Sequence, residues 1–168
     1  MSHPTLETPL PSGAWKLYFH PAKETRWHID TFKKILTVKT LRDLAHMFKA
    51  VKQIDWVRGK FFFTPESIPP LMENAKNIRG GSYSIRVDRS IAGDLMQAYI
   101  TAAVMKMATT TEGDEISCVR ITPRRDFNIL QVWNRDCQKF CKPEGLAIVD
   151  VRIPDGEVKY VPHVEKKI

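Results

Sequence analysis

The chain has 168 residues, of which 43% are hydrophobic, and a formal net charge of +7. This length suits one domain with a single core, and without a secretory leader or an apolar run of about 18 residues we expect an intracellular protein, cytoplasmic or also nuclear, and not a membrane protein. The basic balance favours a polyanionic partner, because cationic surface attracts phosphate.

The first half of the chain predicts strands around one helix. Residues 1–13 are rich in proline and poor in apolar residues, which is typical of a flexible arm. Residues 14–19 alternate like a strand, and residues 27–36 predict a second strand. Thr40, with Asp43 three residues later, opens a helix whose apolar residues recur at helical spacing to Val51. Residues 60–63 form a short apolar strand that Pro65 ends.

The second half predicts a longer helix among further strands. Residues 82–88 alternate as a strand, and the helix covers residues 91–107. Two strands over 116–122 and 128–134 flank a basic turn. A short helical stretch over 136–142 and strands over 146–153 and 158–163 follow, and 164–168 form a tail. We therefore predict an α+β fold, with one antiparallel sheet and helices on one face, as a single domain over 14–163.

The long helix has two apolar sides rather than one. Met96, Ile100, Val104 and Met107 form the second side, which needs a cover of its own. Either the helix that starts after Thr40 packs there or the strip binds a partner, and the pattern favours the two readings equally.

The sequence contains no clear motif for a metal site, a cofactor site or a hydrolytic active site. Cys118, Cys137 and Cys141 are odd in number and form no CxxC pair, so we expect neither a disulfide framework nor a zinc site. The histidines are scattered, and no serine lies in a GxSxG turn. Hydrolysis needs clustered carboxylates to hold metal ions, and the one acidic cluster, from Glu112 to Glu115, is far in sequence from Glu73. A nucleotide or cap hydrolase is therefore the least favoured reading, and we expect a protein without a cofactor that is not an enzyme.

The segment from Lys76 to Tyr83, with the run Lys-Asn-x-Arg-Gly-Gly, leads from a carboxylate-bearing loop into a predicted strand. Four other segments keep a fixed order around it, at residues 13–19, 25–27, 40–44 and 119–133. Together they resemble the translation initiation factor 4E family over about residues 10–153. The resemblance implies a cupped antiparallel sheet backed by helices, which binds the N7-methylguanosine cap of messenger RNA in its hollow between two tryptophans.

The resemblance also implies a role for each of four residues. Trp27 would be the first stacking ring, Glu73 the carboxylate that reads guanine, Arg120 a phosphate contact and Trp133 a wall against the N7-methyl group. These residue types suit the ligand. A base stacked on an aromatic ring gains about 1 to 3 kcal/mol, the carboxylate accepts two N–H groups of guanine, and arginine binds phosphate through charge-assisted bonds.

The chain departs from the family pattern in the ligand loop and on the phosphate side. Met72 stands where the family has its second stacking tryptophan, and a thioether against a ring gains only about 0.3 to 1.5 kcal/mol. The backbone N–H of Met72 would still be able to hold the guanine O6. The family's phosphate-binding lysine has no counterpart at Ile129, so we expect Arg124 and Arg125 to substitute for it.

The helical face departs as well. The tryptophan by which the family grips its scaffold and repressor proteins falls on Ala45, while Leu41, Ile100 and Val104 keep apolar character. We expect a helical partner peptide with a non-standard motif on this face. The favoured function is binding of capped messenger RNA, to recruit or to sequester it in translation initiation. The alternative, motivated by Met72, is a basic module for single-stranded RNA that kept the fold and lost cap selectivity.

Overall fold

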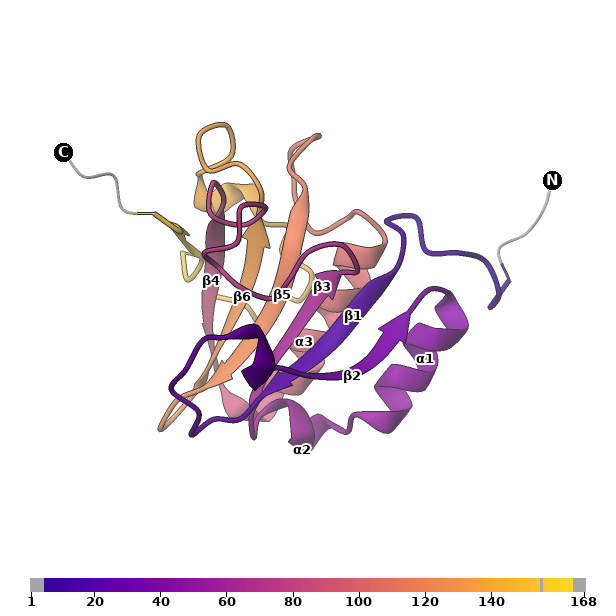
Figure 1. The fold of residues 1–168 in the computed structure, drawn as a ribbon. Helices are drawn as coiled ribbons and strands as arrows, with labels where there is room; N and C mark the ends of the chain where they lie inside the picture. Colours follow the sequence, from indigo (N-terminus) through magenta and orange to yellow (C-terminus); the bar gives the residue numbers. More distant parts are fainter. Residues whose placement is uncertain (1–4, 155, 165–168) are drawn as a thin grey trace.

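A seven-stranded antiparallel sheet forms the body of the protein, with strand order β2-β1-β3-β5-β6-β4-β7 (Figure 1). The computed structural model describes residues 5–154 and 156–164. The strands are β1 (Trp15–His20), β2 (Lys33–Val38), β3 (Lys60–Pro65), β4 (Gly81–Val87), β5 (Ile116–Pro123), β6 (Asn128–Asn134) and β7 (Lys159–Pro162). The helices are α1 (Leu41–Ala50), α2 (Gln53–Trp56) and α3 (Arg89–Val104), with 3-10 turns η1 (Ile29–Thr31) and η2 (Pro143–Gly145).

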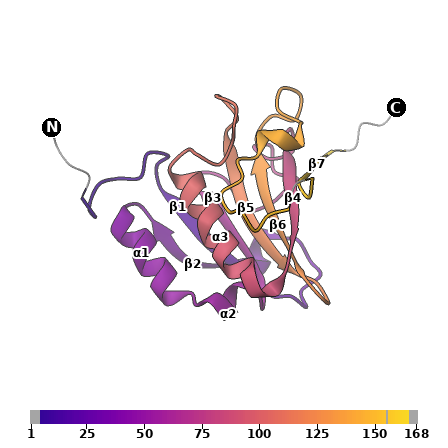
Figure 2. The same cartoon turned by 180° about the vertical axis from the view of Figure 1, so that it is seen from behind.

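The helices lie on one side of the sheet, and α3 runs across that face, in front of the strands in Figure 2. Strand alternation builds the core on that face, because successive side chains point to opposite sides. On β3, Phe61 and Phe63 belong to this core, and the Phe63 ring stacks on Trp15 with centroids 5.0 Å apart. From α3, Leu95 and Tyr99 are fully buried in the same core. The predicted α+β fold is therefore confirmed.

The start of α1 follows its sequence signal closely. The Thr40 hydroxyl accepts the backbone N–H of Asp43 at 3.2 Å, and the Asp43 carboxylate accepts the N–H groups of Thr40 and Lys39 at 3.3 and 2.9 Å. This reciprocal capping satisfies N–H groups that the first helical turn leaves without a backbone partner.

Three of the predicted elements are wrong. Residues 27–36 are not one strand, since a loop and η1 come first and pairing begins at Lys33. Residues 136–142 form a turn rather than a helix, and the helical turn η2 follows it. Residues 146–153 pair only through an isolated bridge from Leu146 to Thr109, and the carbonyl of Ala147 accepts the hydroxyl of Tyr99 of α3 at 2.8 Å. The helix α2, moreover, was not predicted.

Part of the expected N-terminal arm packs on the domain. Leu10 is only 4% exposed, and its N–H donates to the carbonyl oxygen of Lys39 at 3.0 Å. Glu7 pairs with Arg42 of α1. Residues 1–4 of the arm and 165–168 of the tail lie outside the described residues. Within the ranges that are described, no helix is long and apolar enough to span a bilayer.

Candidate functional site

The sheet face opposite the helices, here called the open face, carries a separate aromatic cluster. Its buried members are Phe32, Phe62, Cys118 and Trp133. Tyr18, Leu71 and Met72 pack against it and are partly buried. Aromatic rings thus cover the middle of a face that no helix shields, which is unusual for a sheet exposed to water.

Trp27 lies at the edge of this cluster and is 43% exposed. Its ring is 6.2 Å from both Phe32 and Phe62, and it lies nearly parallel to the His20 imidazole at 4.5 Å. His20 is fully buried at the end of β1. One aromatic face of Trp27 is therefore supported from below, while much of the indole remains open to solvent.

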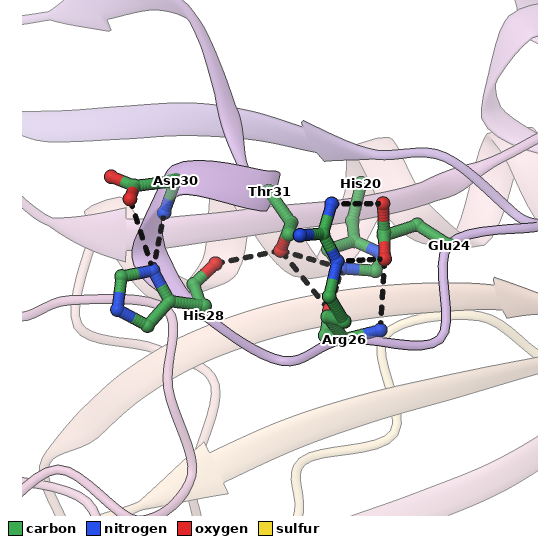
Figure 3. A network of polar contacts seen from close by, with 6 residues as sticks. All are labelled: His20, Glu24, Arg26, His28, Asp30 and Thr31. Atoms are coloured by element: carbon green, nitrogen blue, oxygen red, sulfur yellow. Dashed lines mark hydrogen bonds and ion pairs between the residues drawn. The ribbon is translucent and has the colours of Figure 1, made fainter.

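The loop that carries Trp27 is held by a polar network, shown in Figure 3. His20 Nε2 donates to the carbonyl oxygen of Arg26 at 2.9 Å, and the Thr31 hydroxyl donates to the carbonyl oxygen of His28 at 2.6 Å. The Glu24 carboxylate accepts the backbone N–H and the guanidinium of Arg26, which lowers the pKa of Glu24 to about 2. These bonds replace the strand pairing expected for this segment and fix the backbone on both sides of Trp27.

Two cations lie over the Trp27 ring. The Arg120 guanidinium carbon is 5.2 Å from the centroid of Trp27 and 4.8 Å from that of Phe62. The Lys60 ammonium lies 4.5 Å from the Trp27 centroid. All three distances fall within the range of cation–π attraction.

Burial weakens the hydration of both cations. It lowers the pKa of Arg120 to about 10, and Arg120 Nε has no hydrogen-bond partner among the described residues. Burial, and then repulsion from Arg120 and Arg124, lowers the pKa of Lys60. Repulsion from Arg124 also contributes to the lowered pKa of Arg120, so three cations concentrate positive charge beside the aromatic cluster.

Lys60 and His20 were not predicted as site residues. The alternation of β3 would have found Lys60, because it places Lys60 on the same face as Phe62. His20 follows in the same way from β1, where it pairs with Lys60 across the strands. Neither residue belongs to a motif, so only the register brings them to Trp27.

The loop that carries Met72 and Glu73 is pinned by Asn77. The fully buried Asn77 amide donates to the carbonyl oxygens of Pro69 and Leu71 at 2.9 and 2.8 Å. Met72 packs on the aromatic cluster and Glu73 beside it is exposed. The asparagine of the Lys-Asn-x-Arg-Gly-Gly run thus sets the shape of the loop that holds the predicted carboxylate.

The glycines of this run allow close packing against the last strands. A Cβ on Gly80 would lie 1.8 Å from the carbonyl oxygen of Asn134, and one on Gly81 would lie 2.3 Å from the Tyr160 hydroxyl. The N–H of Gly81 donates to the Asn134 side chain at 3.0 Å. A side chain at Gly80 would therefore displace the backbone of β6, and one at Gly81 would displace the Tyr160 side chain of β7.

Of the residues predicted to bind the cap, the structure gathers four at the cluster, namely Trp27, Met72, Arg120 and Trp133. Trp133, which we expect to form a wall against the N7-methyl group, is only 1% exposed. Its ring is packed edge-on against Phe62 at 6.2 Å and His163 at 5.0 Å. In this structure Trp133 is a floor of the cluster rather than a surface that faces solvent.

The two arginines of the β5–β6 turn are exposed. Arg89, at the start of α3, donates to the carbonyl oxygens of both Arg124 and Arg125 and so holds the turn. Repulsion from Arg124 contributes to the lowered pKa values of Lys60 and Arg120. The binding of phosphate by Arg124 and Arg125 stays a prediction.

The helical face is less apolar than predicted. Ile100 and Val104 are 0% exposed, so the prediction that they face a partner is wrong. Met96, Ile100 and Val104 of the second apolar side lie in one core with residues of α1 and with Leu10, whereas Met107 lies beyond the end of α3 and is exposed. Ala45 is exposed and Leu41 is half-buried. Only these two of the four predicted positions can contact another molecule.

The described residues contain no group of three side chains suited to hold a metal ion. A cavity of about 730 Å³ lies away from the aromatic cluster, where Ser12 and Trp15 meet Lys106 and Arg135. The chemistry on the open face is thus that of a ring flanked by cations, which suits stacking and phosphate binding rather than acid–base or metal catalysis.

The family model described as Eukaryotic initiation factor 4E matches residues 11–163. The chain belongs to this family. Its members are cap-binding translation initiation factors and not enzymes. A relative in this family, eukaryotic translation initiation factor 4E-2 of Schizosaccharomyces pombe, is 24% identical over 128 residues, which are 73% of this chain. The chain spans about half the length of that relative, 52%.

Solved structures of 4E proteins share the fold. The complex of C. elegans eIF4E-3 with the 4E-binding protein Mextli and a cap analog has a TM-score of 0.74 at 21% identity, with 92% of each chain covered. Ascaris suum eIF4E-3 with the m7G cap has a TM-score of 0.70 at 18% identity, covering 96% of this chain and 94% of that one. This initiation factor 4E chain is thus a divergent member that keeps the arrangement of the sheet.

Proposed function

We propose that the protein binds the N7-methylguanosine 5′ cap of messenger RNA on the open face and thereby recruits or sequesters the RNA in translation initiation. The observation that carries this proposal is the exposed Trp27 ring, supported by His20 and flanked by Arg120 and Lys60. Relatives in the family have been solved with m7G cap and with a cap analog. A flat base with a phosphate chain fits this combination of ring and cations.

The base would stack on the part of Trp27 that His20 leaves open. Stacking of a base on an aromatic ring contributes about 1 to 3 kcal/mol. Met72 packs beside the same cluster and would contact the base through its thioether. Glu73, exposed on the loop that Asn77 holds, would accept the N1 and amino N–H groups of guanine.

The phosphates would bind to Arg120, Lys60 and Arg124. Repulsion among these groups, which lowers the pKa of Lys60, would be relieved by an anion. The unpartnered Nε of Arg120 would gain an acceptor. The phosphate chain would thus neutralise charge that the free protein holds at some cost, and Arg125 would contribute only if the turn moves.

A fluorescence titration tests this function. We expect 7-methyl-GTP to quench emission, and the same titration with GTP should show weaker binding. Trp27→Ala should lose about 1 to 3 kcal/mol of binding free energy. Glu73→Gln, which keeps the shape and removes the charge, should lose a similar amount because hydrogen bonds to charged groups are worth about 1.5 to 3 kcal/mol. Unchanged affinity in both variants would overturn the site.

A second function is favoured by the two cations at Trp27. N7-methylguanine is itself a cation, and Lys60 and Arg120 compete with it for the same ring. A protein of this design would bind the phosphates of single-stranded RNA and discriminate little between methylated and unmethylated guanine. Equal affinity for 7-methyl-GTP and GTP in the titration above would support this reading against cap selectivity.

We also propose that a helical scaffold or repressor peptide binds the helix side near Leu41 and Ala45. Structures in the family include complexes with 4E-binding proteins, Mextli in C. elegans and 4E-BP in a schistosome. Here Ala45 offers no aromatic anchor, and Ile100 and Val104 are buried. The peptide would therefore need a motif that does not depend on a tryptophan at position 45.

A further inference from the structure

The open face continues past the Trp27 site toward the edge of the sheet. Four polar side chains lie on this face, as strand alternation requires, and they are Gln131 of β6, Ser84 and Arg86 of β4, and Lys159 of β7. The register links them in a row from the phosphate site, because Arg120 lies opposite Gln131, Gln131 opposite Ser84, and Ser84 opposite Lys159. Three strand spacings of about 4.8 Å separate β5 from β7, so the row extends about 14 Å.

A flat stacking surface lies at one side of this row. The guanidinium of Arg86 lies over the ring of Phe127, 3.8 Å from its centroid. Arg86 is exposed and Phe127 is half-buried in the β5–β6 turn. An exposed guanidinium over an aromatic ring offers a flat group on which a nucleobase can stack.

The row is basic and its charges are not neutralised. Arg86, Lys159, Arg124 and Arg125 make no ion pair with any residue that the structure describes. Asp88, the acid nearest in sequence to Arg86, accepts from the N–H and hydroxyl of Ser90 instead. Asp126 is the one carboxylate of the turn, so positive charge prevails at this side of the molecule.

The row also offers hydrogen bonds at fixed positions. The Gln131 amide donates to the Ser84 hydroxyl at 3.1 Å and accepts from the Trp133 indole at 3.3 Å. These bonds orient Gln131 and leave the Ser84 hydroxyl proton and one amide N–H for another acceptor. Sugar hydroxyls and base edges of an unpaired strand supply such acceptors.

We infer that this tract, formed by Gln131, Ser84, Arg86, Phe127 and Lys159, binds the first nucleotides of the RNA chain that leaves the cap site, as a single strand. The inference rests on the proposed function for its direction, from Arg120 toward β7. Unpaired basic groups select a polyanion, and the Arg86–Phe127 stack selects one with flat, unstacked bases. Duplex RNA does not offer such bases, because they are stacked inside the helix.

Fluorescence anisotropy with three probes tests the tract. The ligands are 7-methyl-GTP, used as a competitor, an unstructured capped ten-nucleotide RNA and the same RNA without a cap. We expect the wild type to bind the capped RNA more tightly than 7-methyl-GTP, and we call the ratio of these affinities the gain. In the double variant Arg86→Ala with Lys159→Ala the gain should fall about tenfold, while the affinity for 7-methyl-GTP stays unchanged. For the uncapped RNA, the slope of log K against log salt should become shallower by about 1.4, as two lost phosphate contacts require.

A matched double variant removes equal charge elsewhere. Lys39→Ala with Lys49→Ala changes two exposed lysines near β2, at the opposite edge of the sheet, and should keep the gain. Phe127→Leu should lower the gain in part, because it keeps apolar bulk and removes the ring under Arg86.

The outcomes separate the tract from the cap site. If the Arg86 and Lys159 double variant still binds capped RNA more tightly than 7-methyl-GTP by the wild-type factor, the proposed RNA tract is wrong and the cap-binding proposal is unaffected. Loss of uncapped RNA binding in that variant, in a protein that ignores 7-methyl-GTP, would support the tract although the proposed function had failed. Equal losses in both double variants, or a loss of binding to phosphatidylserine vesicles but not to RNA, would overturn it.

Discussion

The indole of Trp27 lies on the imidazole of His20, with centroids 4.5 Å apart and ring planes 10° apart. His20 Nε2 also donates to the carbonyl oxygen of Arg26, the residue just before Trp27. The imidazole therefore supports the ring and fixes its backbone at once. This makes His20 the residue that decides how Trp27 is presented.

We predict that His20→Ala weakens binding of 7-methyl-GTP about fivefold to tenfold. The substitution removes a stacked pair worth about 0.5 to 1.5 kcal/mol and frees the loop backbone. His20→Phe is the matched control, since it keeps a flat ring below Trp27 and loses only the hydrogen bond, so its loss should be smaller. Titration of the three proteins checks this, and equal affinity in His20→Ala and wild type would contradict it.

A second prediction concerns the phosphates. Lys60→Ala should weaken binding of the triphosphate cap analogue more than binding of the monophosphate analogue, because Lys60 lies near Arg120 and Arg124, where the phosphate chain would run. Arg124→Ala should act in the same way and Arg125→Ala less, because the charge of Arg124 contributes to the lowered pKa values of Lys60 and Arg120.

The same titrations at low and high salt show whether these effects are electrostatic. The differences among analogues should shrink as salt rises, since exposed charges are screened. A Lys60→Ala protein that ranks the analogues as the wild type does would show that Lys60 points away from the phosphates.

Local signals in the sequence predicted the elements whose physics is local. The capping of α1 needs only Thr40 and Asp43, and the β5–β6 hairpin needs only alternation around a polar turn. The strand prediction for residues 27–36 rested on the apolar residues Ile29, Phe32 and Ile35, which are three residues apart and so do not follow the two-residue period of a strand face. The decisive contact, from His20 to Arg26, joins two segments that no local pattern relates.

The candidate site was predictable where a motif carried it and not where the sheet register did. Asn77 and Gly80 belong to a recognisable run, and their roles follow from its tight packing. Lys60 reaches Trp27 only because β3 lies beside β1. Ile100 is likewise buried in a core to which the sheet and other helices contribute, and the periodicity of α3 alone does not reveal those neighbours.

A third prediction uses the pKa of His163. Its Nδ1 donates to the carbonyl oxygen of Asn77 at 2.7 Å and its Nε2 lies 2.8 Å from the Ser82 hydroxyl, so the neutral ring is fully bonded. Burial lowers the pKa of His163. The hydrogen bond to Asn77 raises this pKa in part, and the charge of Arg120 lowers it further. In the unfolded chain the ring would titrate near 6.5. The unfolded state therefore takes up the proton first as pH falls.

Stability from His163 should consequently be complete above about pH 6.5 and fall as the pH drops toward the lowered pKa of the folded state. We expect the free energy of unfolding in urea to fall between pH 7.5 and pH 5.5 by more in the wild type than in His163→Gln. Glutamine keeps hydrogen-bonding groups but does not titrate. Equal losses in both proteins would exclude His163 as the cause.

A fourth prediction concerns the helix side. Because Ala45 is exposed on α1 and offers no ring, a peptide with the motif Tyr-x-x-x-x-Leu followed by an apolar residue should bind poorly. An aromatic anchor of this kind is commonly worth about 2 kcal/mol, which is roughly thirtyfold in affinity. Ala45→Trp should therefore increase the affinity for the peptide by up to that factor in calorimetry, with no change in the affinity for 7-methyl-GTP. Ala45→Leu, which adds apolar area without a ring, is the control and should increase the affinity for the peptide by less.

Ile100→Asp should instead unfold the protein, since it places a charge in the core. Tight binding of the peptide to the wild type would show that Leu41 and its neighbours suffice without a tryptophan.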